Sequence, residues 1–387
     1  MHNDPRPLIV HVLHHLLIGG MENGLVNLIN HLPAEQFRHA VLCIEDYSDF
    51  RDRIADPSVE VVALHRSRIG AAALRRQVFA HCRRLRPALV HTRNLSGLDA
   101  LVPAWLAGVP RRIHSEHGWD VGNLDGSQWK PALLRRLHRP LVSHYITVSQ
   151  DLQRFLVERI GVGAGHITQI YNGVDTAKFA PPTQQNADHT AEFPEDFRGP
   201  HRLRFGAVGR LQPVKDHASL LHAFAAMRQR SSALREQARL AVLGGGPLFG
   251  ELRELARSLD IEASVWLPGP SDQVAEFLRG LDVFVLPSLN EGISNTVLEA
   301  MASGLPVLAS AVGGNVELVQ PGKTGALFAP GDRAALAELM ARCANDPPWR
   351  SGLGAAARQR AVAEFSLDSM MARYETVYRA YSSGTNR

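Results

Sequence analysis

The stretch DVFVLPSLNEGISNTVLEAMASGLP, residues 282–306, predicts a strand, a loop and a helix in that order. Its opening run of β-branched and aromatic apolar residues ends at Pro287, which is typical of a strand buried on both faces. Good helix formers follow, with Ser294 or Asn295 as the N-cap and Gly304 just past the end. We therefore expect a buried strand that leads through a short loop into a helix.

Two glutamates flank this loop. Glu291 lies on the loop itself, and Glu299 lies about one turn inside the helix. A helix N-terminus carries unpaired backbone N–H groups that suit an anion, and ligands of open α/β sheets bind at the carboxyl ends of the strands. The alternative is that both carboxylates are simply solvated, but the flanking strand and helix are expected to be buried. The pair is therefore a candidate ligand site.

The whole chain alternates strand and helix patterns twice. A chain of 387 residues, 45% of them hydrophobic, exceeds one compact core, so two domains are expected. Strands alternating with helices predict an α/β fold of two Rossmann-like domains with parallel sheets. The expected strands are 8–13, 39–44, 59–64, 88–92, 112–116, 144–149 and 166–170, then 203–209, 238–244, 264–269, 282–287, 306–310 and 325–330.

The domain boundaries follow from the composition of the segments between these strands. Residues 180–202 are rich in Pro, Gln, Asp and Glu and have no apolar period, so they are the expected linker. We expect an N-terminal domain at 1–179, a C-terminal domain at 203–365 and a final helix at 366–387. The two domains are expected to face each other across a hinge.

The cellular location is inferred from the cysteines and from the apolar runs. Cys43, Cys82 and Cys343 stand far apart without metal-ligand spacing, which favours a reducing compartment. The N-terminus has histidines within its apolar part and is expected to form the first strand, not a signal peptide. No apolar run reaches the ~20 residues that span a bilayer. We expect a cytoplasmic protein, either soluble or peripheral at the inner face of the membrane.

Three familiar site motifs fail on inspection. GGGPLFG at 244–250 has Phe249 where a dinucleotide fingerprint needs its third glycine, and PGKT at 321–324 has Glu317 where a P-loop needs its first. The cluster HSEHG at 114–118 has neither the HExxH pattern nor the deaminase cysteines, so chance adjacency explains it better than a metal site.

Two further loops carry residues suited to a diphosphate. Arg210 and Lys215 follow the first strand of the second half, where Arg can bind phosphate bidentately and Lys as a point charge. Gly19 and Gly20 follow the first strand of the chain, where adjacent glycines let the backbone approach a ligand closely. A solvated basic loop and an ordinary tight turn are the respective alternatives.

At this point the motifs resemble a family. GRLQPVKD (209–216), VLGGGP (242–247), PSLNEGISNTVLEAMASGLPVLASAVGGNVELV (287–319) and GKTGALFAPGD (322–332) look like the retaining family 4 glycosyltransferases of GT-B architecture. The order and spacing of all four agree over most of residues 8–365. The segments at 11–33 and 116–120 look further like bacterial sugar transferases of exopolysaccharide and PEP-CTERM (exosortase) loci. Ser294 stands where many relatives have Gly or Pro.

The resemblance implies a role for each candidate residue. Glu299 would accept hydrogen bonds from the ribose hydroxyls of a nucleotide sugar, and Glu291 would contact hydroxyls of the transferred sugar. His117 matches a histidine that lines that sugar. The residues expected to bind the nucleotide sugar are Gly19, Gly20, Arg210, Lys215, Gly292, Ile293, Ser294, Asn295 and Glu299, and those nearest the chemistry are His117, Glu291, Arg210 and Lys215.

The same resemblance implies hexosyl transfer with retention of the anomeric configuration. Negative charge develops on the leaving diphosphate, and fixed cations beside a helix N-terminus can stabilise that charge. The chain contains no Asp-x-Asp pair that would suggest a Mg²⁺ or Mn²⁺ bridge. We therefore expect neither a metal nor a cofactor, with the nucleotide sugar as substrate.

The charge distribution bears on the acceptor. Residues 61–140 carry 14 Lys and Arg against 4 Asp and Glu, in a chain of net charge +4. Such a basic surface could lie against anionic lipid, in keeping with a glycan or polyprenyl-diphosphate-linked acceptor. An arginine-rich solvated face is the alternative. Nucleic acid is not an expected partner, because no aromatic platform or recognition motif accompanies the charge.

Two other functions stay open. A sugar-nucleotide epimerase shares the two-domain architecture and would convert the nucleotide sugar without an acceptor. A non-catalytic subunit would bind the nucleotide sugar and scaffold a polysaccharide complex. The presence of Glu291, Glu299, Arg210 and Lys215 together argues against a site that has lost its chemistry.

Overall fold

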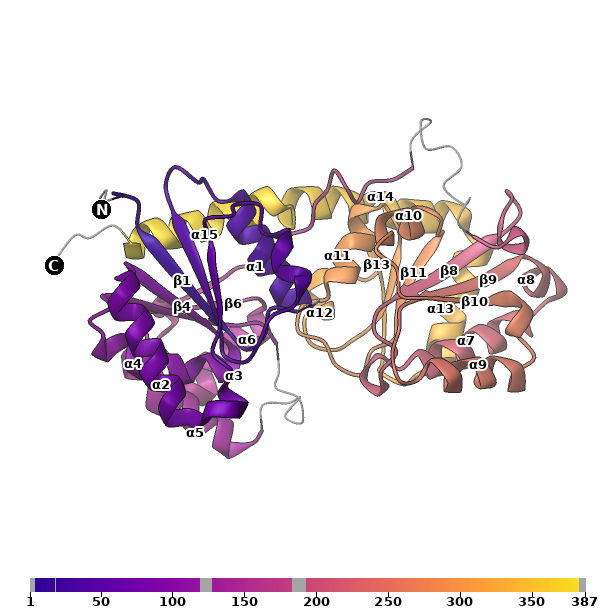
Figure 1. The fold of residues 1–387 in the computed structure, drawn as a ribbon. Coiled ribbons are helices and arrows are strands. Elements are labelled where there is room, and N and C mark those ends of the chain that lie inside the picture. Colours follow the sequence, from indigo (N-terminus) through magenta and orange to yellow (C-terminus); the bar gives the residue numbers. More distant parts are fainter. Residues whose placement is uncertain (1–3, 18, 119–126, 183–192, 383–387) are drawn as a thin grey trace. The chain divides into compact units, whose positions relative to one another are not determined.

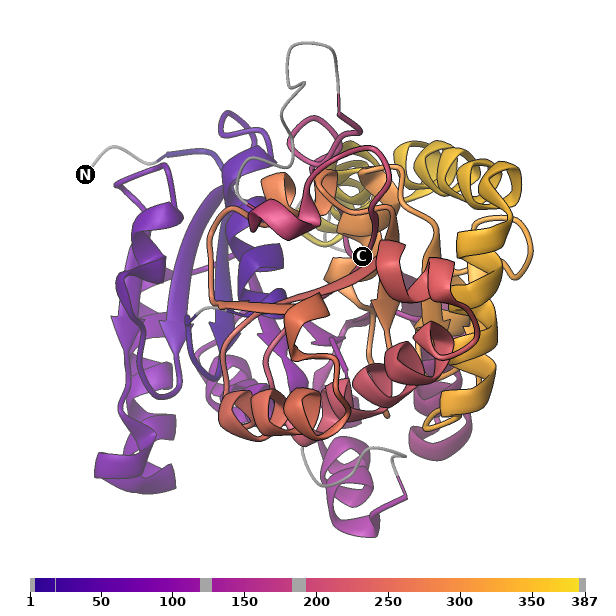
Figure 2. The same ribbon diagram turned by 90° about the vertical axis from the view of Figure 1, so that its right-hand side faces the viewer.

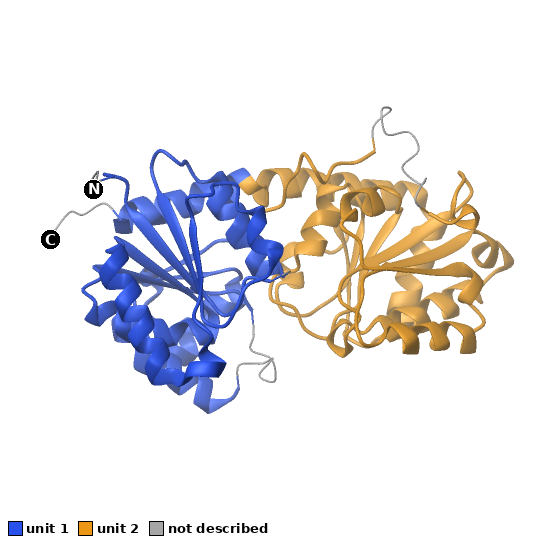
Figure 3. Ribbon diagram, viewed as in Figure 1, with its two compact units in different colours: residues 1–172, 368–387 blue, residues 173–367 orange. Residues whose placement is uncertain are grey.

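The computed structural model describes residues 4–17, 19–118, 127–182 and 193–382 (Figure 1). Ile18, residues 119–120 of the EHGWD segment and residues 183–192 of the expected linker lie outside the described residues. The chain divides into two compact units (Figure 3). Unit 1 comprises Met1–Asn172 with Asp368–Arg387, and unit 2 comprises Gly173–Leu367.

Unit 1 contains a seven-stranded parallel sheet in the order β3-β2-β1-β4-β5-β6-β7. All six residues of β1 are buried, as expected for a strand of a parallel sheet that is covered on both faces. The strand bounds are β1 Leu8–Leu13, β2 Arg38–Cys43, β3 Glu60–Ala63, β4 Leu89–Arg93, β5 Arg111–Glu116, β6 His144–Thr147 and β7 Ile167–Gln169.

Helices cover both faces of this sheet. Alternate residues of β1 pack into separate clusters, one with α2 and α4 and one with α1, and Figure 1 shows these helices on opposite faces. The terminal helix α15 lies on the α1 side, where the Tyr378 ring approaches the His11 ring. The helix bounds are α1 Gly20–His31, α2 Arg66–Leu85, α3 Asn94–Gly97, α4 Leu101–Leu106, α5 Trp129–His138, α6 Gln150–Phe155 and α15 Leu367–Ser382.

Unit 2 contains a six-stranded parallel sheet in the order β10-β9-β8-β11-β12-β13. Helices α7, α9 and α13 cover one face with a single large apolar cluster, and α11 and α14 lie on the other (Figures 1 and 2). The strands are β8 Leu203–Val208, β9 Ala238–Leu243, β10 Val265–Gly269, β11 Val283–Leu286, β12 Val307–Ser310 and β13 Gly325–Phe328. The helices are α7 His217–Arg228, α8 Ser232–Gln237, α9 Phe249–Ser258, α10 Val274–Arg279, α11 Asn295–Ala302, α12 Asn315–Leu318, α13 Arg333–Asn345 and α14 Pro347–Glu364.

The predicted strands are all present, with ends that differ by one or two residues. The division into units differs from the predicted boundary at residue 179, because it falls after Asn172. Val174 explains the shift. Its N–H donates to the carbonyl of Phe365 at 2.8 Å and its carbonyl accepts from Leu367 N at 3.0 Å, which ties this segment to unit 2. The expected final helix is α15, and its residues from Asp368 onward count with unit 1.

The topology determines where ligand-binding loops can lie. The strand order of unit 2 reverses between β8 and β11, and that of unit 1 reverses between β1 and β4. Loops at the carboxyl ends of strands on either side of such a reversal flank a crevice. The loop after β8 carries Arg210 and Lys215, the loop after β11 carries Glu291, and Glu299 lies in the helix α11 that follows. Among the described residues, no helix combines the length and apolar character that a bilayer span requires.

Candidate functional site

The loop between β11 and α11 has the predicted form. Ser294 is the N-cap, and its hydroxyl accepts from the N–H of Val297 at 3.4 Å, while Asn295 is the first helical residue. Glu299 therefore lies one turn inside α11. Gly292 and Ile293 precede the cap, so the N–H groups of 292–295 belong to the loop and the first helical turn, where intrahelical acceptors are lacking.

Glu291 is joined to the neighbouring loop by an ion pair. Its Oε1 accepts from Lys215 Nζ at 2.5 Å and from the hydroxyl of Ser288 at 2.6 Å. Lys215 lies on the loop after β8 and Glu291 on the loop after β11, and these two strands are adjacent. The structure thus brings together two residues that the sequence separates by 76 positions. The ammonium of Lys215 is already partly neutralised by this carboxylate.

Arg210 lies on the same loop as Lys215, but its side chain has a different environment from that of Lys215. Its side chain is exposed, and no hydrogen bond or ion pair to another described residue involves its guanidinium. With respect to the described residues, Arg210 is therefore an exposed cation that is available to an anion.

Glycine contacts hold both loops in place, and the sequence reading missed this role. A Cβ at Gly244 would clash with the carbonyl of Gly209, and one at Gly313, where φ is +45°, would clash with the carbonyl of Glu291. Gly314 N also donates to the carbonyl of Gly292 at 2.8 Å. The glycines of the GGG and GG runs therefore make close backbone contacts. These contacts position the loops that carry Arg210 and Glu291. Their signal in the sequence is the adjacent glycines after β9 and β12.

The carboxyl of Glu299 has no hydrogen-bond or ion-pair partner among the described residues. Burial raises its pKa to about 7, and only the more distant charge of Lys178 opposes the shift. No hydrogen bond to its carboxyl comes from any residue that the structure describes. A carboxylate accepts hydrogen bonds at both oxygens, so this group is suited to a ligand that brings two neighbouring hydroxyls.

Gly19 and Gly20 lie after β1 in unit 1. Gly19 is the N-cap of α1 in an extended conformation, and Gly20 is the first helical residue. A Cβ at Gly19 would clash with the carboxyl of Glu22. The carboxyl of Glu22, at the end of a flexible side chain, therefore lies against the backbone at Gly19.

His117 follows β5 at the same edge of unit 1. Its backbone N–H donates to Asn94 Oδ1 at 2.8 Å, and its Nε2 lies 2.8 Å from the hydroxyl of Ser115. Burial, reinforced by the charge of Arg93, lowers the pKa of His117 to about 3. The ring is consequently neutral at any ordinary pH, so it can act on a substrate through a ring dipole but not as a cation.

Glu116 and His114 of the HSEHG cluster have a structural role. Glu116 is buried and accepts from Arg135 Nε at 2.5 Å and Arg135 Nη2 at 3.0 Å. Burial alone would raise the pKa of Glu116, but Arg135 and His114 lower it to about 2. Throughout the part of the chain that the structure describes, no group of three or more His, Cys, Asp and Glu is placed to hold a metal ion.

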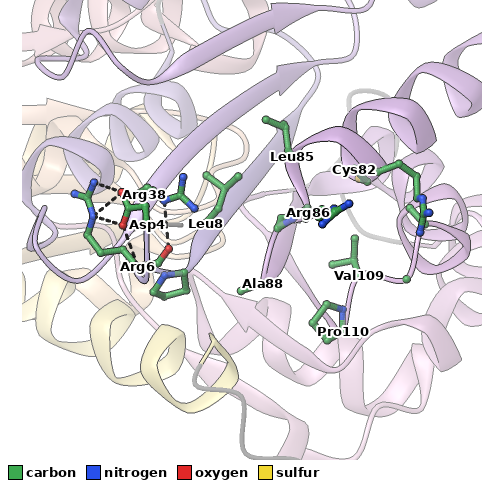
Figure 4. A pocket seen from close by; sticks show the side chains of 15 residues that line it. Asp4, Arg6, Leu8, Arg38, Cys82, Leu85, Arg86, Ala88, Val109 and Pro110 are labelled. Carbon is green, nitrogen blue, oxygen red and sulfur yellow. Dashed lines mark hydrogen bonds and ion pairs between the residues drawn. The ribbon is translucent and has the colours of Figure 1, made fainter. Parts of the chain in front are cut away.

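A pocket of 650 Å³ opens at the opposite edge of the unit 1 sheet (Figure 4). It is lined by residues that precede β1 and β4, and Arg6 and Arg38 within it are held by Asp4. Because Gly19 and His117 lie at the carboxyl ends of the strands, this pocket is separate from the predicted site.

Comparisons with known proteins identify the family of the chain. Residues 18–178 match the family model described as "Glycosyltransferase Family 4", and residues 191–360 match the one described as "Glycosyl transferases group 1". The EpsF glycosyltransferase of Bacillus subtilis is 36% identical over 228 residues, which cover 57% of this chain and 56% of EpsF. The chain thus spans little more than half the length of that relative.

Two further comparisons extend over more of the chain. The Escherichia coli UDP-Gal:alpha-D-GlcNAc-diphosphoundecaprenol alpha-1,3-galactosyltransferase is 27% identical over 349 residues, covering 87% of this chain and 88% of that protein. The crystal structure of Anabaena HepE in complex with UDP superposes with a TM-score of 0.80 at 21% identity, covering 97% of this chain and 100% of HepE. With two parallel-sheet Rossmann-like units and both family models matched, the chain belongs to the family 4 glycosyltransferases of GT-B fold.

Proposed function

We propose that the protein transfers a hexosyl group from a nucleotide-diphosphate sugar to a glycan or polyprenyl-linked acceptor, with retention, in the synthesis of a bacterial exopolysaccharide or surface polysaccharide. The observation that carries the proposal is the unit 2 corner, where an unpartnered carboxyl at Glu299 lies in the helix that follows the Lys215–Glu291 pair. This set provides acceptors for hydroxyl groups and donors for phosphate on adjoining loops. The names of EpsF and of the galactosyltransferase support sugar transfer and a diphosphate-linked lipid acceptor.

Each group has a distinct task in this proposal. The two oxygens of Glu299 accept from the ribose hydroxyls, and charge-assisted bonds of this kind contribute roughly 1.5–3 kcal/mol each. Arg210, Lys215 and the N–H groups of residues 292–295 bind the diphosphate. Glu291 accepts from hydroxyls of the transferred sugar while it orients Lys215. In unit 1, His117 contacts that sugar, and the backbone at Gly19 and Gly20 approaches the substrate.

The chemical step is a substitution at the anomeric carbon. The bond from this carbon to the diphosphate oxygen breaks, and a bond to the acceptor oxygen forms on the same face. The acceptor hydroxyl gives its proton to the departing phosphate oxygen. Negative charge on the diphosphate grows in the transition state, so the cations of the Arg210 loop act there more strongly than in the ground state. No metal ion or cofactor is needed in this scheme.

The membrane proposal is placed on helix α5. Trp129, Leu133 and Leu137 recur at every fourth position and are 68%, 43% and 66% exposed. Exposed apolar side chains at this spacing, with Lys130 and Arg136 beside them, suit the interface of an anionic bilayer.

Helix α2 has fewer unpaired arginines available to a membrane than its sequence suggests. Arg75 is paired with Asp99 at 3.1 Å, and Arg84 is paired with Glu60. Arg76 and Arg83 remain exposed, with no partner among the described residues. We infer that α5 provides the main contact with a peripheral membrane surface and that α2 contributes three exposed arginines, Arg68, Arg76 and Arg83.

The reaction is tested by incubating the purified protein with UDP-, GDP- and ADP-sugars in excess EDTA, with and without a polyprenyl-diphosphate-linked sugar. We expect release of the nucleoside diphosphate that depends on the acceptor and survives EDTA. A changed sugar nucleotide without acceptor would identify an epimerase. Binding without turnover would identify a non-catalytic subunit. An absolute need for Mn²⁺ or Mg²⁺ would contradict the metal-free scheme.

Arg210→Ala is expected to lower kcat by about 10²–10³ with a smaller change in KM, because leaving-group charge is largest in the transition state. Lys215→Met is expected to act likewise, but it also leaves Glu291 without its cation, so it is compared with Lys215→Met/Glu291→Gln. Arg253→Ala, at an exposed arginine of α9, is the matched control. Equal kcat with a raised KM would mean that the cations only bind.

The variant Trp129→Ser/Leu137→Ser is expected to lose sedimentation with phosphatidylglycerol vesicles. Wild-type binding should weaken steeply with salt, since each basic residue near the surface contributes about 1 kcal/mol and the Debye length is ~8 Å at physiological salt. Trp105→Ser/Leu106→Ser is the control, because this exposed pair lies on α4, a helix without basic residues. If the wild type ignores these vesicles even at low salt, the membrane proposal fails.

A further inference from the structure

A chain of buried polar groups links the last helix to His117. The hydroxyl of Tyr378 on α15 lies 2.6 Å from His91 Nδ1, and His91 Nε2 lies 3.0 Å from the hydroxyl of Ser115. That hydroxyl lies 2.8 Å from His117 Nε2. Tyr378, His91 and Ser115 are fully buried, so no solvent competes for these bonds. The chain passes from α15 through β4 and β5 to the carboxyl edge of unit 1.

The direction of hydrogen-bond donation is set at the buried end of these contacts, where Tyr378 and His91 lie near the charge of Arg93. Arg93 is 1% exposed, and no carboxylate of the described residues pairs with it. A guanidinium can only donate. Its terminal nitrogens donate to His11 Nδ1 at 3.3 Å. Among the described residues, His91 Nδ1 is the hydrogen-bond partner of the Tyr378 hydroxyl, and the neighbouring Arg93 cannot accept, so the hydroxyl proton goes to His91 Nδ1.

The donor at Tyr378 then determines which atom donates in each of the next hydrogen bonds. Burial, with the charge of Arg93, holds the pKa of His91 well below its usual value, so the ring is neutral and has one N–H. With Nδ1 accepting from Tyr378, that N–H is on Nε2 and donates to Ser115. The single proton of the Ser115 hydroxyl then goes to His117 Nε2. The neutral ring of His117 must carry its own proton on Nδ1.

Hydrogen-bond donation in the opposite direction, from His117 through Ser115 and His91 to Tyr378, is disfavoured because one buried proton would lack an acceptor. It would require the Tyr378 oxygen to accept from His91, which would leave the hydroxyl proton without an acceptor among the described residues in a fully buried position. An unmade buried hydrogen bond costs more than a made one contributes. Nδ1 of His117 has no partner among the described residues, and the ring is partly exposed. It is thus the open end of the chain.

We propose that Tyr378, His91 and Ser115 are positioning residues that hold His117 as its Nδ1–H tautomer, so that His117 donates a hydrogen bond to an oxygen of the bound sugar and cannot accept a proton from the acceptor. The part of this inference that concerns the sugar rests on the proposed function. The part that concerns the tautomer rests on the contacts alone. The terminal helix then belongs to the site through Tyr378, although it is distant from His117 in sequence.

The tautomer is tested without substrate by ¹⁵N NMR of histidine-labelled protein, in which the His117 signals are those lost in His117→Asn. We expect a protonated Nδ1 and an unprotonated Nε2 in the wild type. Tyr378→Phe and Ser115→Ala should each move His117 toward a mixture of tautomers, while Ser115→Thr should restore the wild-type spectrum.

Tyr374→Phe is the matched control, because Tyr374 lies one turn away on α15, is buried, and makes no hydrogen bond through its hydroxyl to a described residue. It should leave the His117 signals unchanged. A proton on Nε2 in the wild type, or His117 signals unmoved in both Tyr378→Phe and Ser115→Ala when these variants are folded, would overturn the proposal.

The role toward the sugar has its own test. An asparagine amide nitrogen can occupy the place of Nδ1, whereas a glutamine amide nitrogen reaches the place of Nε2. We expect His117→Asn to retain a kcat/KM about tenfold above that of His117→Gln, the order of magnitude of one hydrogen bond. Higher activity of the glutamine variant would contradict donation from Nδ1. If no nucleotide sugar is turned over, the proposed function fails. The NMR measurement still shows whether Tyr378, His91 and Ser115 set the tautomer of His117.

Discussion

Glu299 is half-buried in the first turns of α11, its carboxyl has no hydrogen bond from any described residue, and the unit 2 site is arranged around this group. Its partial burial disfavours the charged form of the carboxyl. Its pKa is raised from 4.5 to about 7, so the folded state holds this proton more tightly than the unfolded chain does. The stabilising contribution of the proton is present below about pH 4.5 and is lost as the pH rises through about 7. A ligand with two neighbouring hydroxyls would offset that loss.

Short-range contacts hold the loops around Glu299, and they keep the charged side chains of Lys215 and Glu291 close together. Close backbone approaches at Gly244 and Gly313 leave no room for a Cβ, and the Lys215–Glu291 pair joins the loops after β8 and β11. Lys215 and Glu291 hold each other, whereas Arg210 has no ion-pair partner among the described residues. A phosphate at these loops would meet the Arg210 guanidinium and the Lys215 ammonium, whose charge Glu291 partly neutralises. Preorganised charges of this kind need not reorganise when charge develops on a leaving group.

Local patterns in the sequence predict the local features well. The run before Pro287 forms β11, Ser294 caps α11, and Glu299 lies where the helical period places it. What the sequence does not reveal depends on contacts between distant positions. The pairing of Lys215 with Glu291, the glycine contacts, and the partners of Arg75 and Arg84 are set by strand order and packing. The chain from Tyr378 to His117 spans most of the sequence, so no local period contains it.

The central claim is that Glu299 is the anchor for the nucleotide, and proton release on binding tests it most directly. Calorimetric titration of UDP, GDP or ADP, whichever raises the melting temperature, is done at pH 7 in two buffers of different ionisation enthalpy. Hydroxyl donors favour the carboxylate, so the wild type should release roughly half a proton more than Glu299→Gln and bind more tightly, with affinity falling as the pH drops below about 7. Equal proton release and equal affinity in the two proteins would contradict the account.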